Sequence, residues 1–410
     1  MSSDTEAMGL NTFVKIESEK SDLVDWEGPN DPENPRNWKN GRKLQHVLLV
    51  SGFTLYSNLA AVMFAPGAAE LVKDFHVTST IVASFTVSIY LLGYVFGPFL
   101  LSSMSEIYGR LIIYHISNVG YLAFTIGCAL SKDTAMFMAG LISLLALVLM
   151  RETFEPAILE RKAAAIRKST GNNQLQARTY NKDRTPAQIF TRATVRPLKM
   201  LLSPIILPLS LYCAFMFGLI YLLFTTFPAV FETTYHFATD ISGLAYLGLG
   251  VGMIISIGLF AVLSDKLLKQ PREGTLERPE LRLILMIWSS PIVPIGFFWY
   301  GWSAEKVTHW IVPILGTMFI GLGAFLILMP AQLYLVDAFG SEAAASALAT
   351  NTVLRSLFGA LLPLAGPPMY ASLGLGWGNS LLAFIGLAFA PLPLLFYKYG
   401  ETLRTRFPIS

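Results

Sequence analysis

A short polar turn between two apolar segments carries an acid and a base four residues apart. It lies at the end of the phrase GPFLLSSMSEIYGR (97–110), in which Glu106 precedes Arg110. A carboxylate at such a turn can pair with an arginine or with a helix N-terminus and hold one end of a helical bundle closed. The alternative interpretation is a charged turn that only fixes the orientation of the flanking helices.

Arg355 lies about eleven residues into an apolar segment, where a charge is expensive and usually faces a cavity or a partner. Asn351 stands one helical turn before it, so both side chains share one helix face. These two residues are candidates for lining a cavity or for coupling transport to an ion. The alternative is a structural arginine that reaches the membrane surface or pairs with an acid such as Asp337.

Polar and aromatic residues inside other apolar segments are further candidates for a ligand cavity. Aromatic rings suit hydrophobic or cationic ligands through stacking and cation–π contact, although many membrane aromatics only pack or lie at the interface. The candidates are Tyr56, Asn58, Tyr90, Tyr212, Phe215, Tyr221 and Tyr246. The carboxylates Glu70, Glu232 and Asp337 fall near the ends of apolar segments, so no acid is an obvious proton carrier.

These residues are positioned by apolar helices that are long enough to cross a membrane. Hydrophobic residues make up 53% of the 410 positions and charged residues 14%, whereas soluble domains carry about 25% charged residues. A bilayer core of about 30 Å needs about 20 apolar residues. The segments that meet this length are 45–66, 82–103, 112–130, 134–150, 201–228, 242–263, 282–302, 309–334, 344–366 and 377–397. We therefore expect an all-α polytopic membrane protein of about ten spans.

The distribution of basic residues predicts that both termini are cytoplasmic. With that orientation, 26 of the 30 lysines and arginines lie in cytoplasmic segments, and only Lys73, Lys132 and Lys306 lie in outside loops. The segments 1–44 and 399–410 are then cytoplasmic tails. The net charge of +3 is too small to argue for nucleic acid as a partner.

The basic segment 151–200 divides the chain between its fourth and fifth spans. Its beginning predicts a helix on the membrane surface, with Leu159, Ala163 and Ile166 facing lipid and Arg161 and Lys162 facing headgroups. The segment is either a tether that fixes topology or a regulatory site for a lipid or a partner. In span six, Gly248, Gly252 and Ser256 are four residues apart and predict a close approach of a neighbouring helix.

Several phrases together resemble the major facilitator superfamily, in its fungal drug:proton antiporter branch. They are GPFLLSSMSEIYGR, the tail phrase DWEGPNDPENPRNWKNGRK, TVSIYLLGYVFGP, YLLFTTFPAVF and SALATNTVLRSLFGALLPLAGPPMY. The resemblance runs from about Asp25 to the end of the chain. It implies that Ser264, Asp265 and Lys266 are a degenerate second copy of the Glu106/Arg110 motif, with a matching gating role for Asp265.

The chain departs from this family in its first half. The resemblance implies two six-helix bundles, yet only four spans (45–150) precede the central loop 151–200, while six spans lie in 201–398. The phrase AMFMAG (135–140) resembles the start of helix four and runs directly into what resembles the end of helix six. We therefore expect a seam at residues 139–142, with most of helices four to six missing and every later span on its usual side.

The resemblance implies a secondary transporter in the plasma membrane. It would export a small hydrophobic or cationic organic compound, such as a drug or a secondary metabolite, from a fungal cell in exchange for protons. The alternatives are a transport-incompetent truncated paralogue or membrane interaction protein, whose exposed faces a homo-oligomer would cover, and an incomplete gene model of a twelve-span transporter. The sequence holds no nucleotide-binding glycine loop and no cluster of metal ligands, so we expect no enzyme, cofactor or metal.

Overall fold

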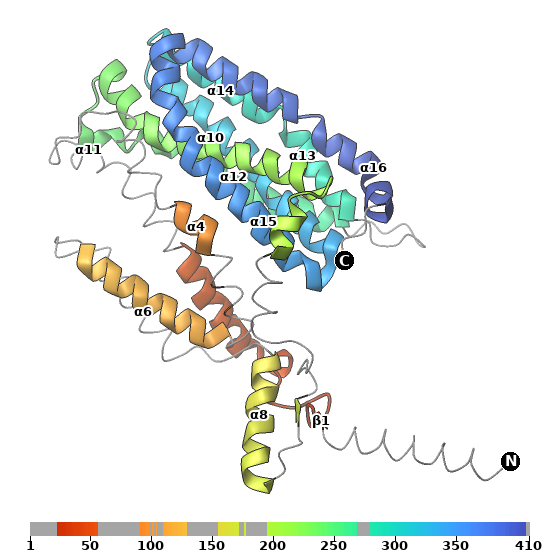
Figure 1. The fold of residues 1–410 in the computed structure, drawn as a ribbon. Helices are drawn as coiled ribbons and strands as arrows, with labels where there is room; N and C mark the ends of the chain where they lie inside the picture. Colours follow the sequence, from red (N-terminus) through yellow and green to blue (C-terminus); the bar gives the residue numbers. More distant parts are fainter. Residues whose placement is uncertain are drawn as a thin grey trace. The chain divides into compact units, whose positions relative to one another are not determined.

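The computed structural model describes residues 23–55, 91–97, 101, 104, 110–128, 155–171, 176–177, 195–268 and 279–406. These residues are mostly helical (Figure 1) and divide into two compact units. The predicted seam and the fourth span lie outside the described residues. Asn58, Tyr90 and Glu106 lie outside them as well.

The first unit combines the N-terminal segment with part of the central loop. It holds a helix over residues 40–55, the 3-10 helix η1 (Pro35–Asn37), α6 (Arg110–Cys128) and α8 (Glu155–Thr170). Two very short strands, β1 (Leu23–Val24) and β2 (Gln176–Ala177), pair in parallel and join the tail to the central loop.

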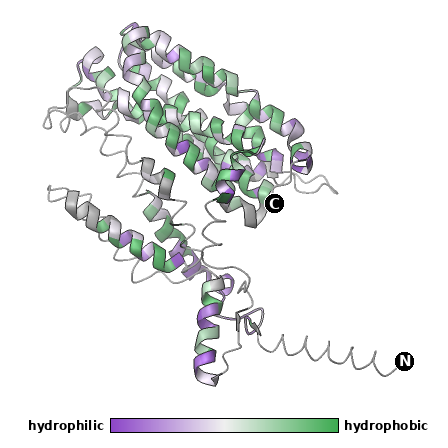
Figure 2. Cartoon of the chain, in the orientation of Figure 1, coloured by the Kyte–Doolittle hydropathy of each residue, from purple (hydrophilic) through white to green (hydrophobic). Residues whose placement is uncertain are grey.

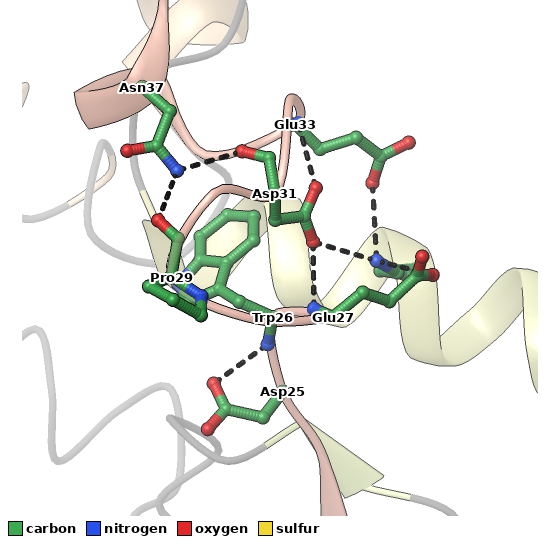
Figure 3. Close-up of polar contacts among 8 residues, drawn as sticks. Asp25, Trp26, Glu27, Pro29, Asp31, Glu33 and Asn37 are labelled. Carbon is green, nitrogen blue, oxygen red and sulfur yellow. Dashed lines mark hydrogen bonds and ion pairs between the residues drawn. The ribbon is translucent and has the colours of Figure 1, made fainter.

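The prediction that the apolar face of α8 meets lipid is wrong for two of its three residues. Leu159 and Ala163 are fully buried and form a small core with Val24, against which Trp26 and Ile166 pack. The face is covered because the N-terminal tail supplies its own apolar side chains and a set of acids for Lys162 (Figure 3). The apolar face of the amphipathic helix α8 is therefore covered by the N-terminal tail of the same chain.

The second unit holds the C-terminal half together with α4 (Leu91–Gly97). Its elements are α10 (Ile206–Tyr235), α11 (Thr239–Ser242), α12 (Ala245–Leu268), η3 (Pro279–Arg282), α13 (Leu283–Ser289), α14 (Ile292–Glu305), α15 (Ile311–Phe389) and α16 (Leu392–Arg406). These helices pack side by side (Figure 1), and the hydropathy of Figure 2 is predominantly apolar along them. The core of this unit is built mainly from α10, α14 and α15, with smaller contributions from α12, α13 and α16.

Within the described residues, five helical stretches are long and apolar enough to cross a membrane. They are Ile206–Tyr235, Ala245–Ser264, Pro279–Glu305, Ile311–Phe339 and Ser346–Arg406. The last has 61 residues, which at 1.5 Å per residue is about three times the thickness of a bilayer core.

The long final stretch reverses direction at Gly374, where φ is +72°. A left-handed backbone is easy for glycine and strained for residues with a Cβ. As a result Tyr370 donates a hydrogen bond to Asn379 Oδ1 at 3.0 Å, although the two residues are nine apart. The reversal falls in the gap between the predicted spans 344–366 and 377–397. Apart from the two-residue strands β1 and β2, the described regular structure is helical, and the chain is a polytopic helical membrane protein as predicted.

Polar contacts between the ends of neighbouring helices lie at both ends of this bundle. At one end Arg282 forms an ion pair with Asp337, and Arg404 pairs with the buried Glu280 at 2.8 Å. At the other end Glu305 accepts hydrogen bonds from the backbone N–H groups of residues 375 and 376 at 2.8 and 3.2 Å. The helices therefore run alternately up and down.

The small residues of α12 do permit close helix packing. A Cβ added at Gly248 would lie 2.1 Å from the carbonyl oxygen of Ile314, and one added at Gly252 would lie 2.0 Å from that of Met318. Ser256 is buried in the same row. The sequence prediction of a close neighbour is confirmed, and the neighbour is the first span of α15.

Candidate functional site

Three aromatic side chains of α10 form a row along one face of that helix. Phe217, Tyr221 and Phe224 follow the spacing i, i+4 and i+7, which places side chains on one helical face. The ring centres of Phe217 and Tyr221 are 4.7 Å apart, and those of Tyr221 and Phe224 are 5.5 Å apart. These distances are typical of favourable aromatic pairs.

Tyr246 of α12 extends this row by one ring. Its ring centre is 5.7 Å from that of Phe224, and its hydroxyl donates to the Phe224 carbonyl oxygen at 2.8 Å. The hydrogen bond fixes the ring because the carbonyl belongs to the same helix as the row. We call Phe217, Tyr221, Phe224 and Tyr246 the aromatic row.

Arg355 of α15 lies at the Phe217 end of the aromatic row. Its guanidinium carbon is 4.7 Å from the centre of the Phe217 ring, a distance that allows cation–π attraction. Asp337, the partner that the sequence suggested for Arg355, is instead paired with Arg282.

Asn351, one turn before Arg355, is 1% exposed, and neither atom of its amide group has a hydrogen-bond partner among the described residues. A buried polar group without a partner costs about 1–3 kcal/mol. Such groups are rare in native proteins and usually mark a function or a bound polar partner. Asn351 and Arg355 together give the end of the aromatic row a polar, positively charged character.

The middle of predicted span two covers the aromatic row. Leu91 of α4 is buried against Tyr221 and Ala360, and Phe217 and Phe224 pack around them. Gly359 makes this approach possible, because a Cβ there would lie 2.8 Å from Leu91 Cδ1 and 3.0 Å from Phe217 Cδ1. The row therefore lies where a helix of the first half packs on the second.

Two predicted aromatic residues point away from this row. Tyr212 is fully buried, donates a hydrogen bond to Ser290 Oγ at 3.0 Å and stacks on Phe389. Phe215 also stacks on Phe389. Both rings pack inside the C-terminal bundle in this structure, and their part in ligand binding remains a prediction.

The predicted gating residues are only partly described. Arg110 is the first residue of α6 and is exposed. Asp265 lies within the last turn of α12, and its side chain is not described. Because Glu106 also lies outside the described residues, the gating role stays a prediction.

Sequence reasoning missed Phe217, Phe224 and Leu91. The spacing of the α10 aromatics was a usable signal, since positions 217, 221 and 224 share one helical face whereas Tyr212 and Phe215 lie on another. No sequence signal could have placed Leu91 on that face, because the contact joins residues more than one hundred positions apart.

Comparison with known proteins identifies the relatives of this chain. A family model described as Major Facilitator Superfamily matches residues 133–363. The chain is 68% identical to an MFS transporter, prlG, of a fungal species (strain NRRL 50135), with 96% of this chain and 98% of that protein covered. It is 61% identical to the MFS-type transporter phm3 of a Pyrenochaetopsis species, with 98% of each chain covered.

A third relative is named for a biosynthetic gene cluster. It is the trichosetin biosynthesis cluster MFS transporter of Gibberella fujikuroi, 43% identical, with 97% of this chain and 92% of that protein covered. The alignments with prlG and phm3 extend over 466 and 473 positions, although this chain has only 410 residues. The chain belongs to the Major Facilitator Superfamily, as a membrane transporter-family protein and not an enzyme.

Proposed function

We propose that this chain exports a small hydrophobic organic compound, a secondary metabolite of a fungal cell, across the plasma membrane in exchange for protons. The observation that carries the proposal is the aromatic row with Arg355 and the unpartnered Asn351 at its end. It offers stacking surface for an apolar body and polar groups for one end of a ligand. The biosynthetic cluster in the name of one relative supports a metabolite as the cargo.

A cationic compound is less favoured than a neutral or anionic one. Arginine keeps its charge at all physiological pH values, and like charges a few ångströms apart repel strongly where water is excluded. A cation could stack only at the Tyr246 end of the aromatic row, away from Arg355.

In the transport cycle that we propose, the two halves of the chain move relative to each other. Rocking of the halves about a site near the bilayer midplane would expose the aromatic row to either side in turn. Glu106, Arg110 and Asp265 would hold the cytoplasmic side closed, and the prediction that both termini are cytoplasmic belongs to this scheme.

Glu232 is the carboxylate that we assign to proton coupling. It lies on α10 two turns beyond Phe224 of the aromatic row. Its Oε1 atom is buried and has no hydrogen-bond partner among the described residues.

The experiment that tests export compares a fungal strain carrying the gene with a deletion strain. Export predicts that an organic metabolite found in the medium of the first strain accumulates inside cells of the second. A Glu232→Gln variant should behave like the deletion, and Glu401→Gln, at an exposed position on α16, should not. Identical extracellular metabolites in all strains would contradict export.

A second candidate is a truncated protein that does not transport. Its support is the length of the alignment with prlG, which has 466 positions. About 394 of them, 96% of the 410 residues, are filled by this chain, so about 70 positions of the alignment have no residue of this chain. Three missing helical portions of about 20 residues each, with their loops, have a similar length. Sequencing the transcript across codons 136–145 decides this point, because in-frame codons recovered there would restore an ordinary twelve-span protein.

A further inference from the structure

The N-terminal tail clamps the central-loop helix α8 through one buried carboxylate. Asp31 is 5% exposed and accepts hydrogen bonds from the backbone N–H groups of Glu27 and Glu33, both at 2.9 Å. It also accepts one from Lys162 Nζ of α8 at 3.1 Å. Figure 3 shows the tail curling around this carboxylate, with Asn37 holding the far side of the loop through the carbonyl oxygens of Pro29 and Asp31.

The clamp creates a groove between the tail and α8. The hollow has a volume of about 430 Å³ and is formed by tail residues that include Trp38, by Arg42 at the start of helix 40–55, and by Ile158, Arg161 and Ala165 of α8. Three separate segments of the chain therefore build it. Its lining combines the apolar side chains of Ile158 and Ala165 with three basic residues and one acid, namely Arg42, Arg161, Lys162 and Glu33.

The basic groups of the groove are not equivalent. Lys162 is neutralised by Glu27, Asp31 and Glu33, whose carboxylates lie 3.0 to 3.8 Å from its Nζ. Arg42 and Arg161 have no carboxylate partner among the described residues. The Arg42 guanidinium carbon lies 5.3 Å from the centre of the Trp38 ring, which holds one side of that guanidinium against the groove wall. The guanidinium groups of Arg42 and Arg161 can therefore donate hydrogen bonds to a ligand in the groove.

The groove lies next to the start of the first predicted span, 45–66. Two residues after Arg42, the helix presents exposed apolar side chains, with Leu44 57% and Leu48 61% exposed. Tryptophan and basic residues at such a boundary are typical of the headgroup layer. A ligand that reaches the groove from the bilayer would present a phosphate to the arginines and its acyl chains to these leucines.

We propose that the groove of Trp38, Arg42 and Arg161 binds the phosphate of an anionic phospholipid headgroup. Arginine forms paired hydrogen bonds to phosphate, and two unpaired guanidiniums match one phosphodiester with its net negative charge. The carboxylate of Glu33, which also lines the groove, disfavours additional phosphate groups there, so we expect a headgroup with a single phosphate, such as that of phosphatidylserine. The lipid would fasten the tail and the central loop to the cytoplasmic leaflet.

The test uses the full chain purified in detergent and titrated with phosphatidylserine, with native mass spectrometry to count bound lipid. Each arginine near a membrane surface contributes about 1 kcal/mol, or about fivefold, so Arg42→Ala/Arg161→Ala should weaken phosphatidylserine binding about 25-fold. Lys168→Ala is the matched control, because Lys168 is an exposed base on the same helix that does not line the groove. Equal loss in the control and the double variant would overturn the proposal.

Two further measurements distinguish a specific lipid site from binding by positive charge alone and from binding of a soluble phosphate. The Arg42→Lys/Arg161→Lys variant keeps both charges but loses the planar donor groups, so it should bind phosphatidylserine more tightly than the double alanine variant and more weakly than the wild type. Binding equal to that of the wild type would mean that positive charge alone is sufficient and would overturn the proposed site. Inorganic phosphate at about 10 mM should not displace the lipid, since it lacks the acyl chains that meet Leu44 and Leu48. Complete displacement would make a soluble phosphate the ligand and would also overturn the proposal. Unchanged melting temperatures in all variants confirm that folding is intact.

Discussion

The guanidinium of Arg355 lies against the face of the Phe217 ring, with its carbon 4.7 Å from the ring centre. The two residues come from α15 and α10, which contribute much of the C-terminal core. A permanent charge is thereby held inside an apolar bundle, next to a row of aromatic rings. This relationship connects the packing of the bundle to its proposed role in transport.

Arg355→Ala should abolish export while the protein still inserts into the membrane. The ring of Phe217 would lose its cation and the ligand its charged contact, so we expect transport to fall at least about tenfold. Uptake into vesicles, normalised to the amount of inserted protein, measures this. Arg406→Ala, at an exposed position on α16, should transport normally. Normal export by Arg355→Ala would show that Arg355 is structural.

Asn351→Leu should raise stability and lower transport. Replacing an unpartnered buried amide by an apolar group of similar size removes a penalty of about 1–3 kcal/mol, which should appear as a higher melting temperature. When a polar group is retained for function at a cost in stability, its removal raises the stability and lowers the activity. A lower melting temperature would contradict the account, because it would mean that the Asn351 amide makes a stabilising hydrogen bond.

Gly252→Ala should destabilise the bundle where Gly250→Ala does not. The added methyl at position 252 would meet the backbone of Met318, and overpacking of this kind costs about 1–3 kcal/mol. No atom lies within 4 Å of a Cβ at position 250, so alanine there should be neutral or slightly stabilising. Thermal unfolding of the two variants side by side measures the difference. Equal stabilities would contradict the close packing of α12 on α15.

The clamp on α8 should hold across the whole physiological pH range. Hydrogen bonds from the backbone at Glu27 and Glu33, and then Lys162, lower the pKa of Asp31 from 3.8. Its contribution to stability is therefore present above pH 3.8 and is lost as the pH falls through the lower folded value.

Lys162 sets the upper limit of the same window. Burial lowers the pKa of Lys162, but hydrogen bonds to the carboxylates of Glu27 and Asp31 outweigh burial, so its pKa is raised from 10.5. Its contribution is present below pH 10.5 and is lost as the pH rises through the folded value. Hydrogen-exchange protection of the Glu27 and Glu33 amides should be flat from about pH 5 to 9 and should drop at pH 7 in Asp31→Asn. A change of protection between pH 5 and 9 would contradict this account.

The helical, membrane-spanning character of the chain could be predicted from sequence because each span is a long local signal. The small residues Gly248 and Gly252 also predicted their close neighbour correctly, since a four-residue spacing fixes one face. The prediction for Leu159 and Ala163 failed for a different reason. An amphipathic pattern says that a face is buried but does not say what covers it, and the cover came from Val24 and Trp26 far away in sequence.

The candidate site was predictable only in part. Arg355 and Asn351 stood out because polar groups are rare in apolar segments. The aromatic row was harder to see. The spacing puts Phe217 and Phe215 on different faces of α10, but because this helix is hydrophobic on all sides the sequence does not tell which face meets which neighbour. Their different surroundings arise from the packing of α4 and α15 against α10.

Proton-driven transport in vesicles bearing the purified chain tests the central claim most directly. An inward-acidic pH gradient should drive uptake of the exported metabolite into vesicles with the chain's cytoplasmic face outward, and the metabolite should in turn drive proton efflux. Glu232→Gln should lose both responses yet still exchange labelled for unlabelled metabolite, because only the proton step is removed. Substrate-dependent proton flux in the wild type and its loss in this variant are the predicted result. No substrate-dependent proton flux in the wild type would contradict the account.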